Sequence, residues 1–287
     1  MGDARSGRSA AWGPLALALL LAAGAGSLGA DAIERCGTLD LGPLELPRAP
    51  RADGADMDQA APAETCLIPL AFHNLYILQD GVSEGLISAE QIEAQIEVLN
   101  QAFGKAGYSF ELRSVEAVHN EAWARMRLRS PEEWQAKRAL GIRPKKVLNI
   151  YTFVSPNELG WSSFPWSAGE NSKRHGIVIE YGTLPGGHQE GSNEGDILVH
   201  EVGHYLGLYH TFEGGCEGDG DYCADTPAEA EPALGCPLGR DTCPAPGQDP
   251  VTNYMDFSDD FCIRRFSPDQ RARMQWAVRT YRPSLCP

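Results

Sequence analysis

The sequence predicts an α/β fold through its first two thirds and an irregular, disulfide-held region near its end. Apolar runs of strand length alternate with amphipathic helical segments between residues 66 and 208, an order typical of α/β domains. After His210, about fifty residues carry little regular structure, and six of the eight cysteines follow this histidine. Disulfides would explain how so long a loop stays compact.

Four segments are predicted to be strands because apolar, β-branched and aromatic residues dominate them. The run KVLNIYTFV is apolar almost throughout, as in a buried central strand. The four segments are residues 66–78, a stretch that starts at Tyr108, residues 146–154 and residues 176–187.

Four further segments are predicted to be helices. Ser88 and Gln91 have the spacing of a capping box, and Ser267 and Gln270 repeat that spacing at the start of a terminal helix. A short helix is expected after Ser130, with proline at its first position. The fourth helix, NEGDILVHEVGHYLGL at residues 193–208, contains two of the seven histidines.

The composition is that of a soluble protein with a sizeable core. The chain has 287 residues, 43% of them hydrophobic, and a formal net charge of −15. So acidic a balance argues against a nucleic-acid partner, whose binding surface is usually basic. It suits a cation-binding protein without proving one.

The N-terminal residues have the three parts of a secretory signal peptide. Arg5 and Arg8 precede the apolar run PLALALLLAAGAG and the small residues SLGA. We therefore expect a signal peptide at 1–30, a pro-segment or linker at 31–65 and a folded domain at 66–287. The protein is expected to be secreted, with no membrane attachment after signal removal, and eight cysteines fit that compartment.

The stretch HEVGHYLGLYH carries the chemistry. His200 and His204 are one helical turn apart and share a face. Gly207 can end the helix, which lets His210 approach from a third direction. Three imidazoles leave one zinc position open for water, and Glu201 can take that water's proton as general base. The five fixed positions of H-E-x-x-H-x-x-G-x-x-H arise by chance on the order of 10⁻⁵ per chain of this size.

This signature resembles the zinc-binding motif of the metzincin metallopeptidases. Met255, in NYMDFSDDFC, matches the methionine turn of that group. Together with ADTPAEAEPALGCP and RDTCP, the sequence is similar to the pappalysin family, in its short, secreted, cytophagalysin-like branch. The resemblance implies a twisted, mostly parallel sheet, an active-site helix above the cleft, and an irregular lower subdomain. It also implies that the strand GIVIEY is the sheet edge that pairs with an extended substrate.

The resemblance assigns further bonds and a second metal. It implies disulfides Cys216–Cys243 and Cys236–Cys262, and we expect the two cysteines outside the usual set, Cys223 and Cys286, to form a third. Asp221, the carbonyl of Cys223 and Thr226 match positions that bind calcium in similar enzymes. Hard oxygen ligands suit calcium, although an acidic solvated loop remains an equal alternative.

Two phenylalanines that follow Met255, Phe257 and Phe261, are interpreted separately. Phe257 stands where many relatives have a tyrosine whose hydroxyl could support the oxyanion, so that role cannot be carried over. Phe261 is interpreted as lining an apolar pocket beyond the scissile bond.

Cys36 admits two interpretations. As in similar pro-segments, its thiolate could occupy the open zinc position and keep the enzyme latent. The alternative is a Cys36–Cys66 disulfide, which an even cysteine count favours.

The sequence thus predicts a secreted zinc metalloendopeptidase, made as a zymogen, whose partners are protein or peptide substrates. The alternatives are a zinc-bound but catalytically weak protein-binding module, favoured only by Phe257, and an enzyme that acts on a non-protein amide. Intact Glu201 and the three histidines argue against the binding module.

Overall fold

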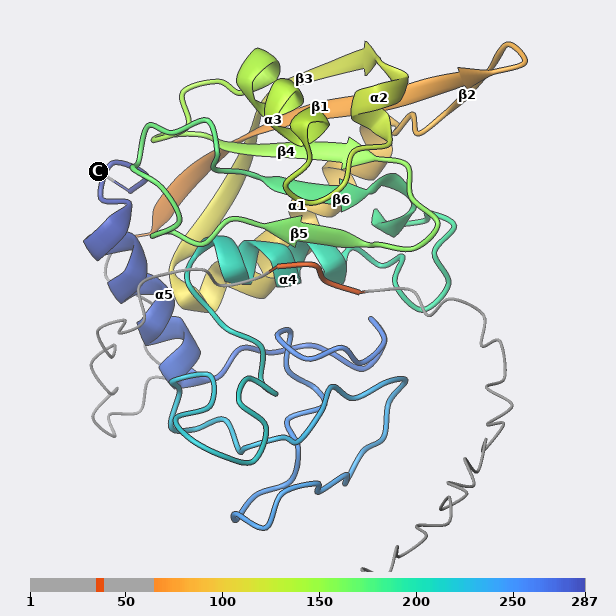
Figure 1. Ribbon diagram of the computed structural model, residues 1–287. Helices are drawn as coiled ribbons and strands as arrows, with labels where there is room; N and C mark the ends of the chain where they lie inside the picture. Colours follow the sequence, from red (N-terminus) through yellow and green to blue (C-terminus); the bar gives the residue numbers. More distant parts are fainter. Residues whose placement is uncertain (1–34, 39–64, 287) are drawn as a thin grey trace, which may run out of the picture. The chain divides into compact units, whose positions relative to one another are not determined.

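The structure is a computed structural model that describes residues 35–38 and 65–286, within one compact unit, Ile33–Pro287. The expected signal peptide and most of the expected pro-segment lie outside the described residues. The described chain forms a sheet with helices on both faces and an irregular lower subdomain, residues 206–266 (Figure 1). No helix in this part of the chain is both long and apolar enough to cross a bilayer.

The sheet is mostly parallel, as predicted, and its longest strand, β1 (Cys66–Gln79), pairs with three others. Its parallel neighbours are β3 (Tyr108–His119) and β4 (Leu148–Phe153), and β4 pairs in parallel with β6 (Ile177–Glu180). All residues of β4 and β6 are buried, which explains their continuous apolar runs. Short antiparallel strands, β2 (Val82–Glu84) and β5 (Gly160–Ser162), complete the sheet.

The cleft edge of the sheet is not the strand that the resemblance implied. The segment GIVIEY forms β6, which lies between β4 and β5 and so has no free edge. The edge is β5, whose three residues are too few to give a recognisable sequence pattern. An extended peptide can therefore add to the sheet only along Gly160–Ser162 on this side.

Helices cover both faces of the sheet. α1 (Ala89–Phe103) and α4 (Asp196–Tyr205) pack on one face, and α5 (Pro268–Tyr281) joins the same apolar cluster. α2 (Glu121–Ala124) and α3 (Pro131–Leu140) cover the other face. Two single 3₁₀ turns lie at Gly104–Ala106 and Tyr181–Thr183.

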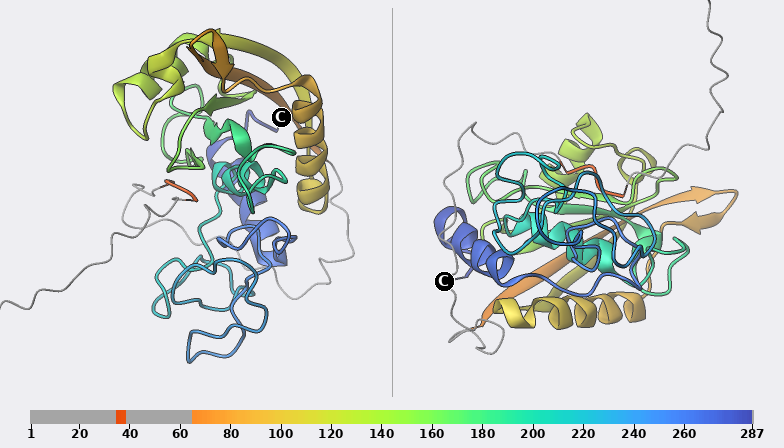
Figure 2. Two further views of the ribbon diagram at one scale, coloured as in Figure 1. Left: turned by 90° about the vertical axis from the view of Figure 1, so that its right-hand side faces the viewer. Right: turned by 90° about the horizontal axis from the view of Figure 1, so that it is seen from below.

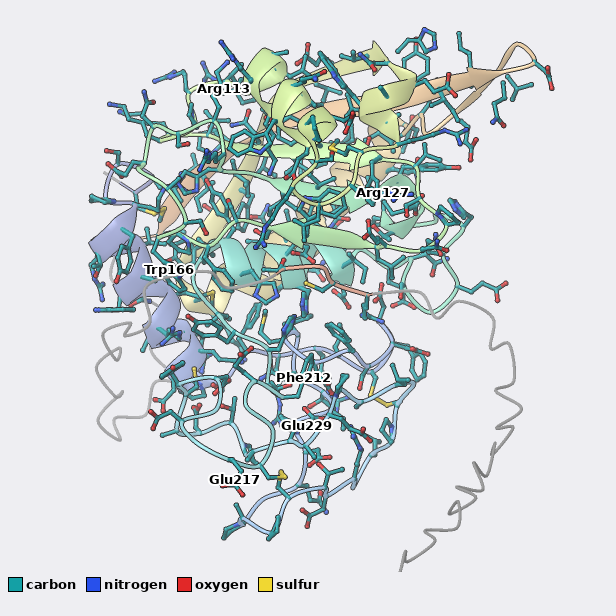
Figure 3. The ribbon with its side chains drawn as sticks, viewed as in Figure 1. Arg113, Arg127, Trp166, Phe212, Glu217 and Glu229 are labelled. Carbon is teal, nitrogen blue, oxygen red and sulfur yellow. A yellow bond between two sulfur atoms is a disulfide. The ribbon has the colours of Figure 1, made fainter. Side chains whose placement is uncertain are left out.

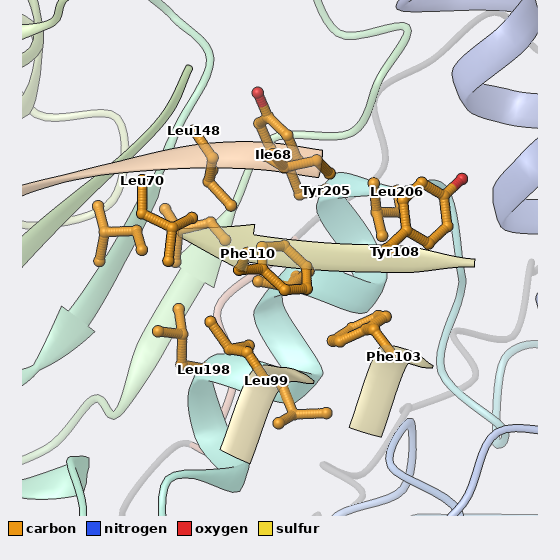
Figure 4. Close-up of a cluster of buried hydrophobic side chains, with 14 of the residues drawn as sticks. Ile68, Leu70, Leu99, Phe103, Tyr108, Phe110, Leu148, Leu198, Tyr205 and Leu206 are labelled. Atoms are coloured by element: carbon orange, nitrogen blue, oxygen red, sulfur yellow. The ribbon is translucent and has the colours of Figure 1, made fainter. Parts of the chain in front are cut away.

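The main core lies between α1, α4 and the sheet (Figure 4). Phe103 of α1 meets Phe110 of β3 at 5.5 Å between ring centroids, and its other neighbour is Phe266 at 4.9 Å. Leu198 and Tyr205 of α4 pack into the same cluster. The core holds α4 on one side, and the opposite side of the helix lies above the lower subdomain, as two further views show (Figure 2).

The lower subdomain is held by buried polar contacts and disulfides instead of regular structure. Arg240 pairs with the buried carboxylates of Glu229, at 3.0 Å, and Asp249, at 3.3 Å. Glu229 also accepts from the hydroxyl of Thr211 at 2.9 Å. Figure 3 shows Phe212 directly below α4 and Glu229 deeper in this subdomain.

Two of its disulfides, Cys216–Cys243 and Cys236–Cys262, are those that the resemblance implies. The third expected pairing, Cys223–Cys286, is wrong. Cys286 bonds to Cys66, with the two Cα atoms 5.3 Å apart, whereas Cys223 is a buried free thiol. The alternative Cys36–Cys66 bridge is wrong for the same reason, since Cys36 is also free. The fold carries the end of α5 next to the start of β1, and sequence spacing could not reveal this.

Replacing Cys66 and Cys286 together by alanine should lower the free energy of unfolding by about 2–5 kcal/mol, because their bond spans 220 residues. Urea unfolding measures the change. Cys223→Ala is the matched control, since it removes a buried thiol but no cross-link. A linked Cys223–Cys286 peptide in a non-reducing digest would contradict this pairing.

Candidate metal centre

The helix α4 carries three of the candidate site residues. All ten of its residues are buried, so it is enclosed between the sheet and the lower subdomain. His200 and His204 lie one turn apart, and Glu201 follows the first of them. The burial of the whole helix fixes these side chains more firmly than an exposed surface would.

The end of α4 brings in the third histidine. Gly207 has a φ of +106°, and a Cβ at this position would lie 2.6 Å from the Cβ of Ala277 in α5. Both the conformation and the close approach therefore require glycine. The chain turns here, and Leu208 returns to the helix through a bond from its N–H to the carbonyl of Gly203 at 2.9 Å. His210 then reaches the two helical histidines.

The three imidazoles converge through their Nε2 atoms. The Nε2 of His204 lies 3.1 Å from that of His200 and 3.1 Å from that of His210. His200 Nδ1 donates to the carbonyl of Tyr254 at 2.7 Å, and His204 Nδ1 donates to that of Leu208 at 2.7 Å. A carbonyl oxygen only accepts, so both of these rings carry their proton on Nδ1 when neutral and leave a lone pair on Nε2.

The lowered pKa values of the three histidines favour neutral rings, which can bind a cation. Burial, and then the neighbouring His204, hold the pKa of His200 and of His210 well below the ordinary value. Burial lowers the pKa of His204 to about 4. Neutral imidazoles with converging lone pairs repel one another, and a divalent metal ion removes that repulsion. The donor set fits zinc, which prefers nitrogen and sulfur ligands.

Cys36 supplies the sulfur of this cluster. Its Sγ lies 3.5 Å from Nε2 of His204, and the four ligand atoms of Cys36, His200, His204 and His210 all lie within 4.8 Å of one another. Burial, and then the carboxylate of Glu201, raise the pKa of the thiol. A bound metal ion reverses this effect, because it stabilises the thiolate.

Glu201 is buried beside the same cluster. Its Oε2 accepts from the hydroxyl of Thr38 at 2.9 Å, and burial raises its pKa to about 8. Thr38 also accepts from the backbone N–H of Ser162 in β5 at 2.8 Å. Gly37 donates to the carbonyl of Gly160 at 2.9 Å. Residues 36–38 thus lie against the free edge of the sheet and cover Glu201.

Met255 lies directly beneath α4, as expected of a methionine turn, and is fully buried. A Cβ on Gly203 would come 2.4 Å from its sulfur, so a larger residue at this position of the helix would displace the Met255 side chain. The backbone carbonyl of Met255 accepts from Thr211 at 3.2 Å, beside His210.

Phe257 lies among the histidines without adding a polar group. Its ring centroid is 5.1 Å from that of His210 and 5.7 Å from that of His200. Phe212 stacks on His210 at 4.7 Å and meets Phe257 edge-on. Tyr254 contributes its backbone carbonyl, whereas its ring packs on Phe266. The surroundings of His210 are therefore apolar and aromatic.

A buried ion pair lies next to the cluster. Arg35 Nη2 is 2.7 Å from Asp260 Oδ1, and the side chains are 9% and 1% exposed. Arg35 also donates to Ser192 at 3.1 Å. Phe261, which was expected to line an apolar pocket here, is 65% exposed. The residue that faces inward is the acidic neighbour, Asp260.

The candidate calcium ligands also come together. The hydroxyl of Thr226 lies 2.6 Å from Asp221 Oδ1 and 2.8 Å from the carbonyl of Cys223. Asp221 Oδ2 is buried and has no hydrogen-bond partner among the described residues. Burial raises the pKa of Asp221 to about 7. These three oxygens could face a shared cation.

Sequence reasoning missed the residues that surround the histidines. Arg35, Thr38 and Asp260 sit in segments without periodicity, and their contacts span 157 to 225 positions. Gly203 does stand inside the motif, but nothing in the motif marks that position as glycine. The only signal was proximity in sequence of Arg35 and Thr38 to the singled-out Cys36.

Comparison with known proteins places these observations in a family. The family model described as "Pregnancy-associated plasma protein-A" matches residues 144–279. An extracellular metalloprotease of Verticillium alfalfae is 45% identical over 208 residues, which are 70% of this chain and 72% of that protein. One of Colletotrichum graminicola is 40% identical over 236 residues, which are 80% and 82%.

Solved structures agree in fold. Mature mirolysin of Tannerella forsythia, in complex with a cleaved peptide, superposes with a TM-score of 0.66 at 26% identity and covers 78% of this chain and 97% of that one. A promirolysin mutant of the same organism superposes with a TM-score of 0.64 at 25% identity and covers 79% of this chain and 85% of that one.

Proposed function

Since the chain belongs to the pappalysin family of metzincin metallopeptidases, we propose that it is a secreted zinc endopeptidase, made in a latent form. The observation that carries this proposal is the convergence of three Nε2 atoms beside a buried glutamate. His200, His204 and His210 would hold the zinc. The names of the fungal relatives support an extracellular place of action.

The reaction would be peptide-bond hydrolysis. The three histidines would hold a zinc ion, which would polarise the scissile carbonyl and lower the pKa of a water molecule. Glu201 would accept a proton from the attacking water and would pass it to the leaving amine. The carbonyl bonds of His200 and His204 keep both rings oriented throughout.

The substrate would lie extended along β5. Gly37 now donates to the carbonyl of Gly160, and this is the contact that an added strand makes. A substrate can take that position only when residues 35–38 have left it.

Residues 35–38 would keep the enzyme latent. The Sγ of Cys36 lies among the zinc ligand atoms, and Thr38 holds Glu201. A thiolate on the zinc excludes the water that the reaction needs. One structural relative is likewise a pro-form, as its name promirolysin says.

Arg35 would indicate which side chain the neighbouring pocket accepts. Its guanidinium is paired with a carboxylate that is only 1% exposed. Removal of Arg35 leaves Asp260 buried without a cation, and a basic side chain of the substrate would replace it. The pocket is therefore proposed to favour arginine or lysine.

Asp221, the carbonyl of Cys223 and Thr226 would hold a calcium ion in the lower subdomain. The support is the meeting of three oxygens around a buried, unsatisfied carboxylate oxygen. Calcium would bind all three oxygens and take the place of the single proton that the Thr226 hydroxyl can donate between the other two.

The catalytically weak binding module remains the second candidate, and Phe257 is the observation that favours it. The Phe257 ring lies beside His200 and His210. Since it has no hydroxyl, it cannot donate a hydrogen bond to the oxyanion that forms during peptide hydrolysis.

We expect Glu201→Ala to lower kcat by about 10²–10⁴-fold, because the mutant lacks the group that moves the proton. Cleavage of denatured casein by the processed protein measures the effect at equal zinc content. Glu217→Ala, an exposed carboxylate of the lower subdomain, is the control. A zinc-loaded wild type that does not cut would favour the binding module, and Phe257→Tyr would then be tested for a gain of activity.

In the full chain, Cys36→Ala should cleave casein at least about tenfold faster than wild type before any processing, since a sulfur ligand is lost from the metal. The control is Cys223→Ala, which removes the other buried free thiol. Equal latency of wild type and Cys36→Ala would argue that Cys36 plays no part.

Asp260→Asn should lower kcat/KM for peptides with arginine at the pocket by about 10²-fold, because it removes a buried charge but keeps an acceptor. Peptides with leucine at that position should change by less than about threefold. Asp259→Asn is the neighbouring control. Equal losses for both peptides would refute a charge-selective pocket.

A further inference from the structure

The start of the terminal helix contains a capping box that reaches further than a helix cap. Gln270 Oε1 accepts from the backbone N–H of Ser267 at 2.9 Å, and the backbone N–H of Gln270 donates to the Ser267 hydroxyl at 3.1 Å. The same motif, Ser88 and Gln91, begins α1 at an exposed position. Gln270, by contrast, is fully buried.

The buried amide of Gln270 faces the methionine turn and bonds to Asn253. Its Oε1 accepts from Asn253 Nδ2 at 2.8 Å, and its Nε2 donates to Asn253 Oδ1 at 3.1 Å. These two reciprocal bonds fix which way both amides point. Asn253 Oδ1 then accepts a second bond, from the backbone N–H of Met255 at 2.9 Å. The side chain of Asn253 thus braces the turn from within.

Tyr254, which lies between Asn253 and Met255, contacts the candidate metal ligand His200. Tyr254 has its N–H on the carbonyl of Arg265 at 3.0 Å, and its own carbonyl accepts from His200 Nδ1 at 2.7 Å. The position of that carbonyl depends on its neighbours, Asn253 and Met255, which the amide pair holds. A shift of the turn would rotate the ring of His200 or remove its partner.

We infer that Gln270 is a positioning residue for the zinc site: through Asn253 it fixes the methionine turn and the Tyr254 carbonyl that orients His200. The inference rests on the proposed zinc role of His200. It assigns to α5 a part in the chemistry, although Gln270 lies 70 positions after His200 in the sequence.

Two substitutions separate this role from capping. Gln270→Glu keeps the oxygen that accepts from Ser267 and from Asn253, but it cannot donate to Asn253 Oδ1. Gln270→Leu removes every one of these bonds. Gln91→Glu and Gln91→Leu are the matched controls. Gln91 holds the same capping-box position in α1, where its side chain accepts from the backbone N–H of Ser88 at an exposed site.

The first readout is the rate at which the full chain releases zinc to a chromogenic chelator, at a temperature where circular dichroism shows each variant folded. Both Gln270 variants should release zinc about 10–100-fold faster than wild type, and both Gln91 variants within about twofold of it. In the processed protein, kcat should fall by a similar factor while KM changes by less than about threefold.

If Gln270→Glu retains zinc and kcat like wild type, Gln270 is only a cap and the inference is overturned. If Gln270→Leu does not fold, Gln270→Glu alone decides. Zinc release does not require proteolysis, so a zinc-loaded wild type that cuts no peptide would refute the proposed function and still leave this inference tested.

Discussion

The constraint on which the molecule depends is the close approach of three neutral imidazole nitrogens. Two of the three Nε2 separations are 3.1 Å, and lone pairs at that distance repel unless a cation lies between them. Two backbone carbonyls hold His200 and His204 in place by accepting their Nδ1 protons. The surrounding fold serves to keep those carbonyls and rings from relaxing apart.

The two halves of the molecule meet this constraint by different means. Above the site, an apolar core between sheet and helices packs against one side of α4, and all ten residues of this helix are buried. Below it, the chain has little regular structure. Ion pairs between Arg240 and two buried carboxylates, together with two disulfides, take the place of a core. Such polar contacts need exact partners, which explains why this half follows no periodic sequence pattern.

All four described residues of the N-terminal segment, 35–38, contact the candidate site or the sheet edge beside it. Arg35 pairs with Asp260, Cys36 lies at the histidines, and Thr38 binds Glu201. Gly37 meanwhile bonds to the sheet edge at Gly160. One short peptide therefore contacts a buried carboxylate, the histidine cluster, Glu201 and the edge of the sheet together.

The sequence by itself determined the fold class, the principal helices and strands, and the histidines and glutamate of the site. Periodicity and the spacing of His200, Glu201, His204 and His210 are local properties, so they can be seen along the chain. The tertiary structure decided what lies far apart in sequence: the Cys66–Cys286 bond, β5 as the cleft edge, and Asp260 instead of Phe261 facing inward. It also decided that Gln270 braces the turn beside His200. Each of these depends on which distant segments the core brings together, and no local pattern encodes that choice.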